Sequence, residues 1–342
     1  NGVEVLLKDN PSLQADMVVL AIGVTPDTAL AKEAGLELGI KGSIVVNDRM
    51  ETSVPDIYAA GDAVQVKHYV TGDDALISLA GPANKQGRII ADNICGGDSR
   101  YLGSQGSSVI KVFDITAATT GINETNAKKS GLEVDTVILS PMSHAGYYPG
   151  GKVMTMKVVF EKDTYRLLGA QIIGYEGVDK RIDVLATAIH AGLKATQLKD
   201  LDLAYAPPYS SAKDPVNMAG FMIDNIAKGT LKQWHLEDMD KISKDKSVVL
   251  LDVRTVGEFN RGHMDGFKNI PVDELRERIN EIEKGKPVYL ICQSGLRSYI
   301  ASRILEGNGY ETYNFSGGFR FYDVVVNDRV LIERSYVCGM DY

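Results

Sequence analysis

The chain has 342 residues, of which 44% are hydrophobic, and this length predicts about two to three domains, each with a sizeable core. Its 37 lysines and arginines face 45 aspartates and glutamates, and the net charge of −8 argues against a nucleic-acid partner held by a basic surface. Neither a membrane-spanning run nor a signal segment is present in the sequence, so we expect a cytoplasmic protein without membrane partners.

Cysteine usage limits the chemistry further. The three cysteines, Cys95, Cys292 and Cys338, are too few and too far apart for a disulfide framework or a Cys-x-x-Cys zinc site. The five histidines also lack a metal-ligand spacing, so we expect no metal. A cysteine that matters here should work as a single thiol.

The first hundred or so residues are typical of a parallel α/β sheet. Three apolar, β-branched runs predict strands at 16–23, 43–48 and 56–63. Gly61 and Asp62 stand at the carboxyl end of the third run, where open α/β sheets bind their ligands. A helix is expected from about 84 to 93, with Pro82 near its first turn.

After residue 104 the pattern changes to grouped strands. We expect strands at 109–121, 134–140, 153–160 and 167–174. The last two should form a hairpin, and a helix should follow because Ile182, Leu185 and Ile189 recur at helical spacing. Strands followed by a helix indicate an α+β domain.

The last hundred or so residues alternate between strand and helix patterns in the βαβ manner. The expected elements are a strand at 248–253, a helix at 272–285, a strand at 287–292, a helix at 298–309 and a strand at 310–315. In the first of these helices Leu275, Ile279 and Ile282 should share a buried face. This pattern predicts a separate α/β domain.

Cys292 closes the strand at 287–292 and opens the loop CQSGLRS, which runs directly into a helix. Loop N–H groups and the positive end of the helix should converge there on a thiolate or a bound anion. Gly295 permits the sharp turn, and Arg297 adds a permanent charge. We therefore expect Cys292 to act as a nucleophile.

Together with LLDVRTVGEFNRGHMDGFKNIP before it and NFSGGFR after it, this loop resembles the rhodanese family. The resemblance implies that Cys292 accepts a sulfane sulfur as a persulfide and passes it to a thiol or to cyanide. It also implies that Arg297 holds an anionic donor. The implied cradle of the sulfur consists of Gln293, Ser294, Gly295, Leu296 and Ser298, and the implied scaffold ion pairs involve Asp252, Arg254 and Glu258.

The segment DIYAAGDA, with AIGVTPDT before it and LAGPANKQGR after it, resembles the second FAD-binding segment of the pyridine nucleotide-disulfide reductase family. The resemblance implies an FAD cofactor that is reduced by NADH or NADPH. Its implied cofactor-binding residues are Gly61, Asp62, Ala63, Pro82 and Tyr205.

Two further motifs, SHAGYYPGGK and LAYAPPYSSAKDPVNMAG, resemble the coenzyme A-disulfide reductase group and its rhodanese-fused branch. The resemblance implies a homodimer in which Tyr147 and Tyr205 reach across to the redox cysteine and the coenzyme A thiol of the partner. It also implies that Lys85 and Lys213 lie near the coenzyme A phosphates.

Glycine loops for the FAD pyrophosphate and for NAD(P)H, and a flavin-facing redox cysteine, do not occur in this sequence. We therefore expect the C-terminal part of a larger protein. Its expected organisation is the end of an NAD(P)-binding domain at 1–41, the second part of an FAD-binding domain at 42–104, an interface domain at 105–228 and a rhodanese-like domain with its linker at 229–342.

The expected activity is FAD-dependent reduction of coenzyme A disulfide or persulfide, or of related small thiol substrates, by NAD(P)H, with sulfur transfer through Cys292. Two alternatives remain open. One is an NADH oxidase on the same scaffold, and the other is a dimerising sulfur carrier without flavin chemistry. The residues that select between NADH and NADPH are not in this sequence.

Overall fold

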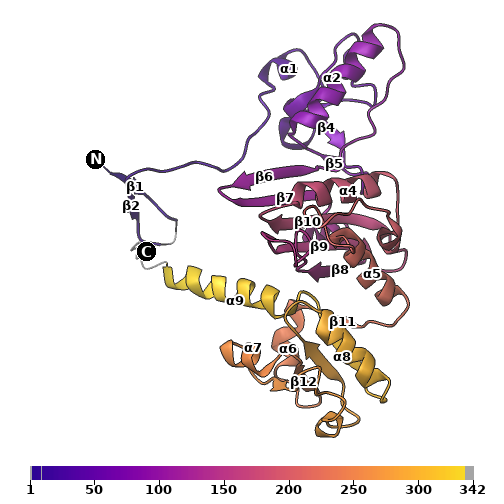
Figure 1. The fold of residues 1–342 in the computed structure, drawn as a ribbon. Helices are drawn as coiled ribbons and strands as arrows, with labels where there is room; N and C mark the ends of the chain where they lie inside the picture. Colours follow the sequence, from indigo (N-terminus) through magenta and orange to yellow (C-terminus); the bar gives the residue numbers. More distant parts are fainter. Residues whose placement is uncertain (1, 9, 336–342) are drawn as a thin grey trace. The chain divides into compact units, whose positions relative to one another are not determined.

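The computed structural model describes residues 2–8 and 10–335, so Cys338 lies outside the described residues. By its internal contacts the chain divides into two units (Figure 1). The first holds the chain up to Lys67 together with Asp73–Ser104, and the second holds His68–Gly72 and the chain from Gln105 onward. Among the helices of the described part, none combines the length and the hydropathy that crossing a membrane requires.

The first unit consists of short strands and one long helix. Its elements are β1 (Val3–Val5), β2 (Leu13–Ala15), α1 (Ala29–Glu33), η1 (Ile40–Gly42), β3 (Ile44–Val45), η2 (Gly61–Ala63), β4 (Val64–Lys67), β5 (Asp74–Ala75) and α2 (Ala80–Ile94). β1 and β2 form an antiparallel hairpin, whereas β3 pairs in parallel with β4, which β5 joins antiparallel. Helix α2 has Pro82 in its first turn, as the sequence predicts, although it begins before the expected position.

Two of the expected strands in this unit are wrong. Residues 16–23 form no strand, since β2 ends before them at Ala15, and Leu20 and Ile22 are 81% and 90% exposed. An apolar run of this kind forms a strand when neighbours cover both its faces, and no described strand of the unit pairs with it. At 56–63 Asp56 and Gly61 have φ values of 65° and 80°, which interrupt the extended backbone and leave an isolated bridge and η2.

The second unit begins with a five-stranded antiparallel sheet in the order β6-β7-β10-β9-β8. Its elements are β6 (Ser108–Val112), β7 (Ile115–Gly121), α3 (Glu124–Lys129), β8 (Val134–Leu139), β9 (Met154–Glu161), β10 (Leu167–Gly174), α4 (Val178–His190), η3 (Ala195–Asp200) and α5 (Pro215–Ala227). Residues 109–121 were expected to form one strand, but they form the β6–β7 hairpin. Phe113 turns the chain with φ 50° and has no glycine beside it to signal the turn.

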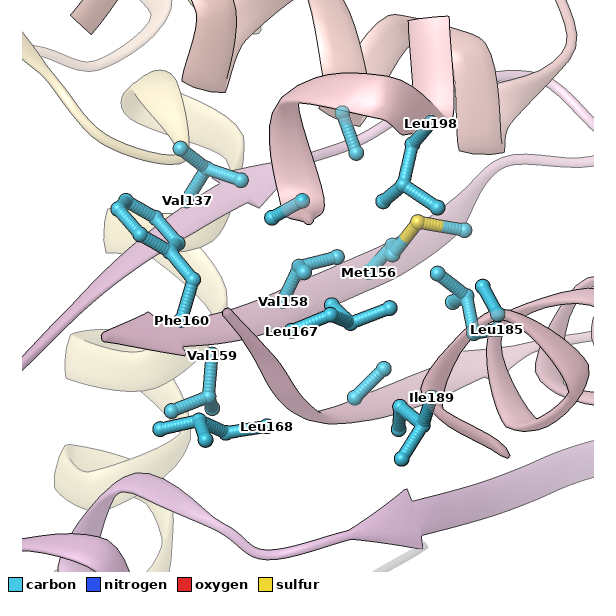
Figure 2. Packing of buried hydrophobic residues seen from close by; sticks show 14 of the residues in the cluster. Val137, Met156, Val158, Val159, Phe160, Leu167, Leu168, Leu185, Ile189 and Leu198 are labelled. Carbon is cyan, nitrogen blue, oxygen red and sulfur yellow. The ribbon is translucent and has the colours of Figure 1, made fainter. Parts of the chain in front are cut away.

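Helices α4 and α5 bury their apolar faces against this sheet. Met156 and Val158 on β9 lie in one cluster with Leu185 of α4 and Leu198 of η3, and all four are fully buried (Figure 2). The expected hairpin at 153–174 and the expected helix are confirmed, because the alternation of side chains along β9 and the three-to-four spacing on α4 point into the same core.

The same unit ends in a parallel sheet in the order β11-β15-β14-β12-β13. Its elements are β11 (Gln233–Trp234), η4 (Leu236–Asp238), α6 (Met239–Ile242), β12 (Val249–Asp252), α7 (Val256–Arg261), β13 (Lys268–Asn269), η5 (Ile279–Glu281), β14 (Val288–Ile291), α8 (Leu296–Glu306), β15 (Thr312–Phe315) and α9 (Gly318–Ser335). Since parallel strands end at one edge, the loops after β12, β14 and β15 meet there.

The helix expected at 272–285 is also wrong, because the segment consists of turns and the short η5. Leu275 and Ile282 are nevertheless buried and Ile279 packs against them, as the spacing predicts. Burying these three side chains in the connection between β13 and β14 outweighs the helical propensity of the charged residues between them.

Candidate functional site

Cys292 directly follows β14, the middle strand of the parallel sheet, and it is only 1% exposed. Gly295 reverses the chain with φ 99°, and α8 begins at the next residue. The Cys292 sulfur accepts hydrogen bonds from the Gly295 N–H at 3.1 Å and from the Ser298 hydroxyl at 3.2 Å. Two donors and the start of an α-helix therefore surround the sulfur, which is a setting that stabilises negative charge on it.

The segment after β15 supports this loop from one side. The Phe319 N–H donates to the Cys292 carbonyl at 2.8 Å, and the Arg320 N–H donates to the Gln293 carbonyl at 3.1 Å. Gly318 makes this approach possible because a side chain there would lie 2.7 Å from the Gln293 carbonyl oxygen and the Ser294 nitrogen. Contact with the cysteine loop thus explains why a glycine is required at position 318.

Two ion pairs support the loop from the side of β12. Arg254 and Asp252 form a fully buried pair, with Nη2 and Oδ2 2.6 Å apart. Arg297 donates to both carboxylate oxygens of Glu258 at 2.7 Å, and this hydrogen bonding lowers the pKa of Glu258 to about 2. The guanidinium of Arg297, which we expected to hold an anionic donor, is therefore committed to Glu258.

Tyr147 and Tyr205, which lie far apart in the sequence, meet in the structure. Their hydroxyl groups are 2.5 Å apart, although the two residues are 76% and 45% exposed. The hydrogen bond with Tyr147 raises the pKa of Tyr205. A pair of phenols that shares a hydrogen bond and faces solvent is suited to donating a proton to a molecule that arrives from outside.

Arg181 ties together the loops that carry these tyrosines. It is 1% exposed and pairs with the buried Asp214 at 3.0 Å. Its guanidinium also donates to the carbonyls of Ser143 and Tyr209, at 2.9 and 3.3 Å. Sequence reasoning missed Arg181 because nothing in helix α4 signals that its partners come from two distant segments, at Ser143 and at 209–214.

The predicted cofactor-binding residues of the first unit lie at η2 and at the start of α2, which pack against each other. Asp62 is exposed, and the Gly61 N–H donates to Gln86 Oε1 at 2.7 Å. No side chain caps α2, so the N–H groups of its first turn can donate hydrogen bonds to a polar group of a ligand. A carboxylate beside an uncapped helix start fits a cofactor that offers both hydroxyl donors and polar acceptors, as FAD does.

The remaining predicted residues are placed as follows. Lys85 on α2 and Lys213 before α5 are exposed, and among the described residues neither forms an ion pair. Gln293, Ser294 and Leu296 belong to the Cys292 loop, and Leu296 is 65% exposed. Cys95 ends helix α2 and is exposed. In the described part of the chain, His, Cys, Asp and Glu side chains form no group of three or more suited to a metal.

Three family descriptions match consecutive parts of the chain. Residues 1–87 match the pyridine nucleotide-disulphide oxidoreductase family, and residues 107–215 match its dimerisation domain. Residues 235–322 match the rhodanese-like domain. The fold class expected from the sequence is confirmed: a partial nucleotide-binding domain, a dimerisation domain and a parallel-sheet rhodanese domain.

Similar proteins with known structures cover nearly all of the chain. The reduced Bacillus anthracis protein CoADR-RHD is 48% identical with a TM-score of 0.92, and the match covers 95% of this chain and 58% of that one. A NAD-dependent persulfide reductase from A. fulgidus is 42% identical with a TM-score of 0.84, covering 91% and 56%. The CoA-dependent NAD(P)H sulfur oxidoreductase of Pyrococcus furiosus is 39% identical over 63% of this chain. This chain spans about half the length of that relative, at 48%.

Proposed function

Because the chain belongs to the pyridine nucleotide-disulphide oxidoreductase family and joins its dimerisation domain to a rhodanese-like domain, we propose that it serves the NAD(P)H-dependent reduction of coenzyme A disulfide or persulfide, with sulfur transfer through Cys292. The observation that carries this proposal is the pair of donors on the Cys292 sulfur. The two similar structures that extend over the rhodanese segment support it as well, since they cover 95% and 91% of the chain.

In the sulfur-transfer half, the Cys292 thiolate attacks the terminal sulfur of a donor. A sulfur–sulfur bond forms at Cys292, and the bond between that sulfur and the donor breaks, with its electron pair leaving on the donor fragment. The Gly295 N–H and the Ser298 hydroxyl stabilise the anionic sulfur before and after this step. A thiolate acceptor then attacks the outer sulfur, takes it as its own persulfide and restores the Cys292 thiolate.

In the reductive half, Tyr147 and Tyr205 supply a proton. The Tyr205 phenol has an ordinary pKa of 10, which the hydrogen bond with Tyr147 raises further, so it is protonated near neutral pH as any tyrosine is and can donate to a thiolate that leaves a disulfide or persulfide. Both hydroxyls face solvent, and we propose that they serve the site of a partner subunit in a homodimer. Lys213, which is exposed and lies close to Tyr205 in sequence, would pair with phosphates of coenzyme A.

FAD would be held by Gly61, Asp62, Ala63 and Pro82, and it supplies the relay of electrons from NADH or NADPH to the sulfur substrate. Asp62 would accept a hydrogen bond from a cofactor hydroxyl. The open first turn of α2, which Pro82 rigidifies, would face an electron-rich edge of the cofactor.

Because the FAD pyrophosphate loop and the redox cysteine do not occur in this sequence, the experiment uses the chain extended at its N-terminus by a segment that supplies them, purified with and without added FAD. We expect flavin absorbance to remain with the protein after gel filtration, and bound flavin reduced with dithionite to be reoxidised by coenzyme A persulfide faster than by oxygen. Faster reoxidation by oxygen, with no thiol substrate needed, would instead indicate an NADH oxidase. A colourless protein that still transfers sulfur from thiosulfate would indicate a sulfur carrier without flavin chemistry.

A further inference from the structure

Asn314 of β15 is a buried polar residue beside the Cys292 loop. It is 4% exposed, and its Nδ2 donates to the Gly295 carbonyl at 3.1 Å. The Oδ1 atom of the same side chain is buried and has no hydrogen-bond partner among the described residues. A buried acceptor without a partner lowers stability, so the benefit of an asparagine at this position lies in its contact with the cysteine loop.

The Gly295 carbonyl has three donors within hydrogen-bond distance. Besides Asn314, the Tyr299 N–H donates to it at 3.1 Å as the first backbone bond of helix α8. The Ser298 hydroxyl also lies 3.1 Å from this carbonyl oxygen. A carbonyl oxygen has two lone pairs, and Tyr299 and Asn314 occupy them both. The Ser298 hydroxyl is therefore the donor for which this carbonyl has no further lone pair.

The Ser298 hydroxyl has a second acceptor, because the Cys292 sulfur lies 3.2 Å from its oxygen. A hydroxyl carries one proton, so it cannot donate fully to both the sulfur and the Gly295 carbonyl. A serine in the first turn of a helix commonly bonds to the carbonyl three residues before it, which here is that of Gly295. Asn314 removes this competing acceptor, and the proton of Ser298 turns to the sulfur.

We propose that Asn314 is a positioning residue for sulfur transfer. By occupying the Gly295 carbonyl, it directs the Ser298 hydroxyl to the Cys292 sulfur. The proposal rests on the sulfur-transfer function proposed for Cys292. A thiolate sulfur only accepts hydrogen bonds, so a donor that is directed to it stabilises its negative charge. Asn314 acts on this charge through Ser298 and not on the sulfur itself.

A double-substitution cycle in the full chain separates this role from general support of the loop. The ratio of thiolate to thiol at Cys292 is measured at one fixed pH by ultraviolet absorbance, with Cys292→Ser added to each variant as its blank. We expect Ser298→Ala and Asn314→Ala each to lower this ratio about three- to tenfold, since each removes one hydrogen bond from the sulfur. In the Ser298→Ala background, Asn314→Ala should change the ratio no further, because the hydroxyl that Asn314 directs is gone.

Thr312→Val is the matched control. Thr312 is buried on the same strand, and its hydroxyl donates at 2.8 Å to Glu306 at the other end of α8. This substitution should leave the thiolate ratio unchanged. Asn314→Leu, which keeps a side chain of similar size but has no donor, replaces Asn314→Ala if thermal unfolding shows that the alanine variant does not fold.

The result that would overturn the proposal is an unchanged ratio in the Asn314 variant, or an equal fall in the ratio with and without the Ser298 hydroxyl. The second outcome would mean that Asn314 supports the loop without directing Ser298. Because the ratio is measured without turnover, the cycle decides the role of Asn314 even if the chain transfers no sulfur. Sulfur transfer by a chain in which Asn314 proves to have no such role would leave the function of Cys292 intact.

Discussion

Glu258 is the side chain whose titration should leave the clearest mark on the stability of the rhodanese segment. Its pKa is lowered from 4.5 to about 2 by Arg297, so the folded state binds this proton less tightly than the unfolded state does. The stabilisation is therefore fully present above pH 4.5 and is lost as the pH falls toward 2.

We expect Glu258→Gln to lower the unfolding free energy near neutral pH by about 1 kcal/mol. The difference from the parent chain should shrink between pH 4.5 and 2, because the parent loses the same ion pair by protonation. Denaturant unfolding at a series of pH values measures it. A difference that stays constant across this range would show that the Glu258–Arg297 pair does not stabilise the fold electrostatically.

The tyrosine pair gives a second prediction at the scale of single residues. The hydrogen bond with Tyr147 raises the pKa of Tyr205, so Tyr147→Phe should bring that pKa down toward 10. An NMR titration with tyrosine labelled at Cζ follows it, and Tyr209→Phe, at an exposed tyrosine, is the control. If the Tyr205 pKa does not move in Tyr147→Phe, the two hydroxyls are not paired in solution.

At the scale of elements, the segment after β15 supports the cysteine loop, and Gly318 is the point of contact. Gly318→Ala should destabilise the domain by about 1–3 kcal/mol and slow sulfur transfer, because its Cβ would lie 2.7 Å from backbone atoms of Gln293 and Ser294. Gly285→Ala is the matched control, since Gly285 also has a positive φ of 83° but has open space around its Cβ.

Thermal unfolding of the two variants measures the destabilisation that a side chain causes at a positive φ. Their sulfurtransferase rates measure whether the cysteine loop has also been displaced. Both should lose some stability, whereas only Gly318→Ala should also slow transfer. Equal effects on the rate would mean that the segment after β15 does not position the loop.

Over the whole molecule, prediction from the sequence was most accurate where one short motif contains all the residues that determine its structure. The Cys292 loop is one example, because strand, glycine and helix follow directly and bring their donors to the sulfur. The sheet around it is another, since alternating strand and helix patterns allow few topologies.

What could not be predicted depends on distant partners. The bonds of Arg181 reach Ser143, Tyr209 and Asp214, and no local pattern relates these positions. The run at 16–23 has the composition of a buried strand but lacks a strand to pair with among the described residues of its unit. The commitment of Arg297 to Glu258 likewise became visible only when the loops after β12 and β14 met at one edge.

The central claim is that Cys292 carries a transferable sulfur, and mass spectrometry after incubation with thiosulfate tests it most directly. We predict one added sulfur atom on the peptide that contains Cys292, removed by a thiol acceptor, and none in Cys292→Ser. Cys95→Ser, at an exposed cysteine of the first unit, should leave the modification in place. An unmodified Cys292 in a chain that still transfers sulfur, or full transfer by Cys292→Ser, would contradict the account.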